Sequence, residues 1–128
     1  MITFEDFEPG RSFGSVPVTL DDQLWSNWTR LYPGDSACAP EMPEGMTAVL
    51  VMKAYMELVA PRPPGNVHAS QSFEVTRLPR LGQTVTTTVT CTGKELRNGR
   101  RWVDLATESR DAEGQHLFNG RMRMIWAA

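Results

Sequence analysis

The sequence predicts an α+β domain in which a curled antiparallel sheet wraps around one central helix. Three observations lead to this prediction. Residues 44–59 are apolar almost all the way round a helix, which is typical of a helix enclosed by other structure. Residues 67–126 divide into four strand-like segments with turn signals between them. The 128 residues contain no repeats, linkers or low-complexity tracts, so we expect a single domain, residues 1–128.

The first part of the chain predicts an edge strand followed by an amphipathic helix. Residues 13–18 have the composition of a strand, and Pro17 limits its pairing. Thr19 is the expected N-cap of a helix over residues 20–32, because a threonine hydroxyl accepts a hydrogen bond from the first turn. The apolar residues of this helix fall on one stripe, which we expect to face the core: Leu20, Leu24, Trp25, Trp28 and Leu31.

A loop rich in proline and glycine joins this helix to the central one. Residues 33–43 contain three prolines and one glycine, so we expect no regular structure in them. A loop of that length between packed elements is often functional. The central helix, residues 44–59, follows directly and stops before Pro61.

Alternating residues indicate antiparallel strands in the second half of the chain. Val85, Thr87, Val89 and Cys91 point one way, while the threonines between them point the other. Asn98 followed by glycine is a strong hairpin signal. The expected strands are residues 67–77, 83–92, 101–109 and 116–126.

Composition and charge argue against several classes of partner. The net charge of −2 favours neither nucleic acid nor a membrane surface. The longest apolar run, residues 48–52, is too short to span a bilayer, and residues 1–7 lack the apolar run of a signal peptide. Cys38 and Cys91 do not have metal-ligand spacing, so we expect no metal and two reduced thiols in a cytoplasmic protein.

Three arginines flank the predicted hairpin turn: Arg97, Arg100 and Arg101. One interpretation is a solvated hairpin tip, which is what a short charge run usually is. The other is a clamp for an anionic substrate, such as a nucleotide phosphate.

Short motifs along the whole chain resemble those of MaoC-like acyl dehydratases and (R)-specific enoyl-CoA hydratases. Residues 4–10, FEDFEPG, resemble the family's opening F-E-D-hydrophobic-x-x-G motif. Residues 19–35 are similar to its first helix and the Gly-Asp pair that follows. Residues 43–46 look like its hydrophobic-x-x-Gly-Met entry to the central helix. Residues 73–83 resemble its R-F-x-x-P-V-x-x-G-D strand and turn.

This resemblance implies the hot-dog fold, a curled antiparallel sheet wrapped round one long helix. Members of the family hydrate trans-2-enoyl thioesters of CoA or acyl carrier protein, or run the dehydration in reverse, without a metal or redox cofactor. They usually dimerise by joining sheets edge to edge. We therefore expect an acyl thioester substrate, no cofactor, and a homodimer or a heterodimer with another hot-dog chain.

The resemblance also locates an active site and shows where this chain departs from it. The family places its acid and base in a D-x-N-x-x-H loop before the central helix. Asp35 matches the aspartate, but Ala37 replaces the asparagine and Pro40 replaces the histidine. Proline has no ionisable group, so the residue used for general acid–base chemistry is missing. Gly45 occupies the position whose backbone N–H holds the thioester oxygen.

Carboxylates beside this loop are candidates to replace the histidine. A carboxyl group in an apolar tunnel can serve as acid or base near neutral pH, and Glu44 and Glu41 lie close to Gly45 in sequence. Asp35, Glu44 and Glu41 are therefore the predicted catalytic residues. Alternatively, an acidic residue in the first turn only complements the helix dipole.

Substrate-binding residues are predicted around the same helix start. Gly45 and Met46 begin the central helix, and Trp25 and Trp28 lie on the helix that covers the mouth of the acyl tunnel in this fold. His68 begins the next strand and can reach a cleft. The alternative for the tryptophans and Met46 is ordinary core packing, and for His68 an ordinary surface position.

Three functions remain open on these residues. The first is a hydratase or dehydratase, that is, a lyase, with an altered catalytic set, or a related thioesterase that uses a carboxylate. The second is a non-catalytic subunit of a heteromeric dehydratase, because a fold without the histidine is what such a chain retains. The third is an enzyme that has reused the tunnel for a ligand other than a thioester.

Overall fold

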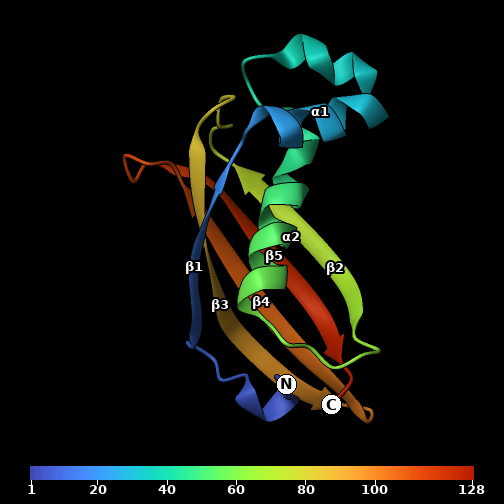
Figure 1. Ribbon diagram of the computed structural model, residues 1–128. Coiled ribbons are helices and arrows are strands. Elements are labelled where there is room, and N and C mark those ends of the chain that lie inside the picture. Colours follow the sequence, from blue (N-terminus) through green and yellow to red (C-terminus); the bar gives the residue numbers. More distant parts are fainter.

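One antiparallel sheet curls around helix α2 (Thr47–Leu58) in the computed structural model, which describes residues 1–128 (Figure 1). The strands are β1 (Ser12–Thr19), β2 (Val67–Val75), β3 (Thr84–Arg97), β4 (Arg100–Arg110) and β5 (His116–Trp126). The remaining helical segments are η1 (Phe4–Asp6), α1 (Asp22–Leu31), η2 (Pro33–Cys38) and η3 (Glu44–Met46). Figure 1 shows α1 beyond the start of α2, and both chain termini near the opposite end of the sheet.

The strand order in space is β1-β3-β4-β5-β2, with every neighbouring pair antiparallel. The β3–β4 hairpin turns at Asn98 and Gly99, whose φ angles of 51° and 74° are left-handed, as a tight hairpin turn requires. The predicted α+β class and the four predicted strands are confirmed, although β3 extends five residues beyond its predicted end at residue 92. β1 lies at one edge, as its proline indicates, and β2 lies at the other.

Residue alternation divides the sheet into a buried face and a polar face. The inward residues of β3, β4 and β5 pack with α2 in one hydrophobic core. Leu50, Val51 and Ala54 of α2 are 0% exposed, so they form the side of the helix that the sheet covers. The outward face of β3 carries Thr84, Thr86, Thr88 and Thr90.

The predicted enclosure of α2 holds on the side that the sheet covers, whereas the opposite side is open in a single copy of the chain. Lys53 and Glu57 are exposed, and Met56 is 54% exposed. The physical reason is that the five strands of one chain curl around only one side of the helix. Apolar residues on the opposite side therefore reach the surface in a single copy of the chain.

The first helix also differs from its prediction at both ends. Its N-cap is Asp21, whose Oδ1 accepts from Leu24 N at 2.8 Å, and not Thr19. Thr19 instead ends β1 and shares a 2.8 Å hydroxyl hydrogen bond with Thr84 of β3. Leu31 is 72% exposed, so the apolar stripe does not face the core along its whole length.

The loop between the two long helices contains more structure than the sequence predicts. Two short 3-10 helices, η2 and η3, lie within or border residues 33–43. Cys38, at the end of η2, is an exposed free thiol. Cys91 in β3 is a buried one, and burial raises the pKa of its thiol. None of the helices is both long and apolar enough to cross a bilayer.

Candidate functional site

Trp28 is the centre of the site that the sequence indicates. Its indole Nε1–H donates a hydrogen bond to Oδ2 of Asp35 at 2.8 Å, in a partly buried position. The contact forms because α1 runs almost without a break into η2. Tyr32 N–H donates to Trp28 O at 2.9 Å, and Asp35 N–H donates to Tyr32 O at 3.0 Å. These turns bring residue 35 back over residue 28.

The same indole lies against the backbone of Gly45. A Cβ atom placed on Gly45 would be 2.8 Å from Cζ2 and 3.1 Å from Cη2 of Trp28. Real Cβ contacts are almost never that short, so only glycine allows the ring to lie there. The small size of Gly45 is therefore already used by a side chain of this protein.

Asp35 and Gly45 contact the same edge of the indole. Nε1, which bonds to Asp35, and Cζ2, which touches Gly45, are attached to the same ring carbon. Two residues that the sequence predicts as parts of one site are thus brought together by a third. The second oxygen of the Asp35 carboxylate, Oδ1, accepts no hydrogen bond within the chain.

The backbone at the start of the central helix has two free donors. Met46 N–H donates to Pro43 O at 3.0 Å and Thr47 N–H to Glu44 O. The N–H groups of Glu44 and Gly45 donate to no acceptor in the chain. Such donors and the positive end of the helix dipole favour an oxyanion or a polarised carbonyl oxygen.

The two glutamates are near this position, but no apolar tunnel surrounds them. Glu44 and Glu41 are both exposed. Glu41 forms an isolated antiparallel bridge with Arg80. Pro40 O accepts from Leu81 N–H at 2.7 Å, so the backbone of Pro40 is held against the loop after β2.

The other predicted site residues make no hydrogen bond with the Asp35 carboxylate. Met46, which is 0% exposed, and Trp25, which is 9% exposed, belong to the hydrophobic core. His68 is exposed near the start of β2, at the far end of α2 from η3 (Figure 1). The second histidine, His116, has both ring nitrogens engaged, with Thr76 Oγ1 at 3.0 Å and Asn119 Oδ1 at 2.9 Å.

Thr47 is a feature of the helix start that the sequence reasoning missed. Its hydroxyl is buried without a hydrogen-bond partner, and the residue is 2% exposed. A threonine at the first position of an otherwise apolar helix is the only sequence signal for it. No group of three His, Cys, Asp or Glu side chains is arranged to hold a metal ion.

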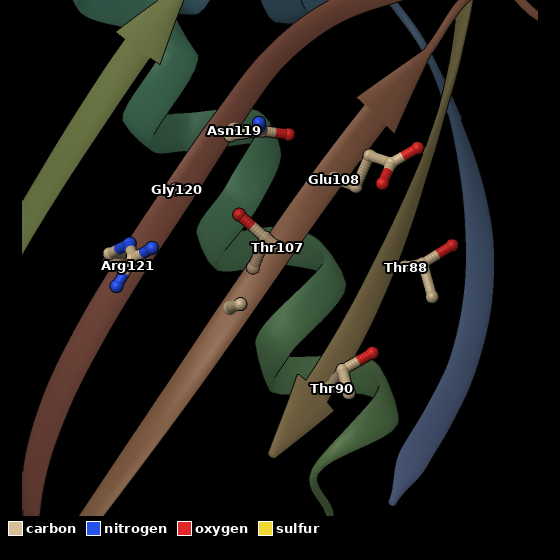
Figure 2. A pocket seen from close by; sticks show the side chains of 8 residues that line it. Thr88, Thr90, Thr107, Glu108, Asn119, Gly120 and Arg121 are labelled. Carbon is tan, nitrogen blue, oxygen red and sulfur yellow. The ribbon is translucent and has the colours of Figure 1, made fainter. Parts of the chain in front are cut away.

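The larger depressions on the surface lie away from Gly45 and Asp35. One of about 290 Å³ crosses β3, β4 and β5 on the face of the sheet turned away from α2 (Figure 2). Its lining is mostly polar and includes Thr88, Glu108 and Arg121. None of these larger depressions is lined by Gly45 or Asp35, and Glu44 and Gly45 are exposed at the helix start.

No protein-family model matches the chain, and no curated protein matches it. Solved structures do. A MaoC-like dehydratase from Rhodospirillum rubrum aligns over 100% of this chain and 99% of its own, with a TM-score of 0.79 and 13% identity. The chain has the hot-dog fold. The resemblance to MaoC-like proteins that the sequence indicates is thus confirmed at the level of the fold.

Two further structures show the same likeness. The unliganded (R)-hydratase PhaJ1 from Pseudomonas aeruginosa matches 98% of this chain and 85% of its own, with a TM-score of 0.76 and 17% identity. A chain of the C-terminally truncated HadBC complex from Mycobacterium tuberculosis, a (3R)-hydroxyacyl-ACP dehydratase, matches 92% of this chain and 98% of its own, with a TM-score of 0.71 and 12% identity.

Proposed function

We propose that this protein binds an acyl thioester of CoA or acyl carrier protein at the start of α2 and catalyses hydratase- or dehydratase-type chemistry there. One observation carries the proposal: a single indole edge, that of Trp28, contacts both Gly45, whose N–H is unbonded, and the Asp35 carboxylate, which has one oxygen free. The fold it shares with solved (R)-hydratases and dehydratases supports the same class of reaction. No cofactor is needed for that reaction.

In the hydration direction, Asp35 takes a proton from water while the water oxygen bonds to C3 of the enoyl group. The electron pair of the C2=C3 bond moves toward the thioester oxygen, and the Gly45 N–H stabilises the enolate that forms. The proton that Asp35 took from water then passes to C2, which returns Asp35 to its carboxylate form. One molecule of water is added in total, and dehydration is the same sequence in reverse.

Replacing Asp35 tests the assignment. We expect Asp35→Asn to lower the hydration rate of crotonyl-CoA or a longer enoyl-CoA about 100-fold or more, the usual contribution of a positioned base. Asp104→Asn is the matched control, because Asp104 is on the outward face of β4. Equal rates in both variants and the wild type would remove Asp35 from the mechanism. Release of free thiol, in place of loss of the double bond, would identify a thioesterase.

A non-catalytic subunit is the second candidate, and Pro40 is the observation that favours it. In that case the chain forms a cytoplasmic heterodimer with a second hot-dog chain, and that second chain supplies the acid and the base. The outer edge of β2 pairs with no strand of this chain, so it can take the partner's sheet. HadBC is a dehydratase complex with this fold.

Binding and turnover separate the two candidates. A purified homodimer that turns over enoyl-CoA supports the enzyme. If acyl-CoA raises the melting temperature of the protein but is not turned over, the result supports the non-catalytic subunit. Ligand at about 100 times its Kd adds about 2.7 kcal/mol to the free energy of unfolding, which a thermal-shift assay resolves.

A further inference from the structure

We propose that Trp28 is a positioning residue, which holds the Asp35 carboxylate at the side of Gly45 so that base and carbonyl donor face one bound group. The kinetic part of this inference rests on the proposed function. The structural part does not, because it concerns contacts within the free protein. It assigns Trp28 a task beyond lining a pocket.

The first step is the bond between the indole and the carboxylate. Trp28 Nε1–H donates to Asp35 Oδ2 at 2.8 Å in a partly buried position. A hydrogen bond to an ionised acceptor is about twice as strong as one between neutral groups. It leaves Oδ1 free, so the indole fixes the direction of the carboxylate without using the oxygen that would meet water.

The second step is the position of the indole ring. The indole is held against Gly45, where Cζ2 would be 2.8 Å from an added Cβ. The ring of Tyr32 lies 4.5 Å away between centroids, tilted by 34°. Contacts with Gly45 and Tyr32 restrict this rigid ring, and with it the direction of its N–H. Asp35 is therefore placed relative to Gly45 and not only relative to its own short helix.

A purely structural role for Trp28 explains less. Trp25, three residues earlier on the same helix, is buried in the core, and its indole N–H has no hydrogen-bond partner. Trp28 is only partly buried, and its N–H is directed to a carboxylate. Packing alone accounts for a ring at this position, but not for the bond that joins the ring to Asp35.

Kinetics of Trp28→Phe give the first test, since phenylalanine keeps a ring but removes the N–H donor. We expect kcat for enoyl-CoA hydration to fall about 10- to 100-fold, while KM changes much less. In the double variant with Asp35→Asn, the Trp28 change should cost nothing further, because it acts through Asp35. Additive losses in the double variant would overturn the inference. Trp102→Phe, on the outward face of β4, is the matched control.

Amide and indole resonances give a second test that needs no turnover. We expect Asp35→Asn to shift both the Trp28 indole N–H and the Gly45 amide signals, and Trp28→Phe to shift Gly45, whereas Trp102→Phe leaves Gly45 in place. Unmoved Trp28 and Gly45 signals in Asp35→Asn would overturn the inference. Coupled shifts in a protein that turns over no thioester would overturn the proposed function and leave the positioning role standing. If Trp28→Phe does not fold, the signals of Asp35→Asn are enough to decide this test.

Discussion

The two ends of helix α2 differ in whether a side chain of the protein bonds to their free backbone groups. At the last turn, Nη1 of Arg62 donates to Met56 O at 2.8 Å and Val59 O at 2.9 Å. Its guanidinium group also lies 5.4 Å from the centre of the Tyr55 ring. At the first turn, no side chain bonds to the free N–H groups of Glu44 and Gly45.

Both ends of a helix expose backbone groups that need partners. Arg62 meets that need at the carboxyl end with a cation, which also complements the negative end of the dipole. At the amino end, the nearest side chain, Trp28, places a ring edge against Gly45 and offers no acceptor. An end closed by the chain itself stabilises the fold, whereas an end left open is available to a ligand. The following changes test this contrast.

Gly45→Ala should have the largest effect. The new Cβ would lie 2.8 Å from Cζ2 of Trp28, a rigid ring that must move. We expect a loss of about 1 to 3 kcal/mol in the free energy of unfolding, as for other overpacked positions, which exceeds the gain in helix propensity. Denaturation in urea measures it. Gly34→Ala is the control, because a Cβ there meets nothing within 4 Å and no loss is expected.

Arg62→Met should cost somewhat less. The change keeps the apolar stem and removes both charge-assisted hydrogen bonds to the end of α2. We expect a loss of about 1 to 2 kcal/mol, because water can replace part of what the partly buried guanidinium supplies. Arg100→Met, at an exposed arginine whose side chain makes no hydrogen bond within the chain, should leave urea unfolding unchanged. Equal stability of the two variants would show that the closed end does not depend on Arg62.

Thr47→Val tests the open end in the opposite direction. The Thr47 hydroxyl is buried and has no partner in the free protein, so burying it costs free energy. Valine has nearly the same shape without that group, and we expect a gain of about 1 kcal/mol in urea unfolding. Thr107→Val is a comparison at the other buried threonine whose hydroxyl has no partner. A loss at Thr47 would mean that the hydroxyl is bonded after all.

How well the sequence predicts each region depends on how far apart in the chain the interacting residues lie. The alternation of Val85, Thr87 and Val89 fixes which face of β3 is buried, and Asn98 with Gly99 fixes the hairpin turn, because both are local signals. The sheet was therefore predictable. The N-cap was not, because Thr19 pairs with Thr84, 65 residues away, and Asp21 takes its place.

The site was predictable in its parts but not in its arrangement. Asp35 and Gly45 emerge from the resemblance to a known family, yet nothing in the sequence indicates that an indole joins them. That contact requires α1 and η2 to meet in one particular way, which depends on how α1, η2 and η3 pack together. Arg62 was missed for a similar reason, since a single arginine within a proline-rich segment has no local pattern.

The smallest effect concerns the response of the closed end to alkaline pH. Tyr55 is 4% exposed, and burial raises the pKa of its phenol above the ordinary 10.0, while the charge of Arg62 acts in the opposite direction. Above about pH 10 the unfolded chain loses this proton and the folded chain keeps it. The contribution of the Tyr55 phenol to the free energy of unfolding is therefore fully present below that pH. It falls as pH rises, by at most about 1.4 kcal/mol per pH unit. Urea unfolding of Tyr55→Phe should lack this part of the decline.

Both proteins need Cys91→Ala as background, because the Cys91 thiol titrates with the same sign. Adding Arg62→Met should steepen the decline, since it removes the charge that favours the phenolate, and an unchanged slope would separate Tyr55 from the end that Arg62 closes.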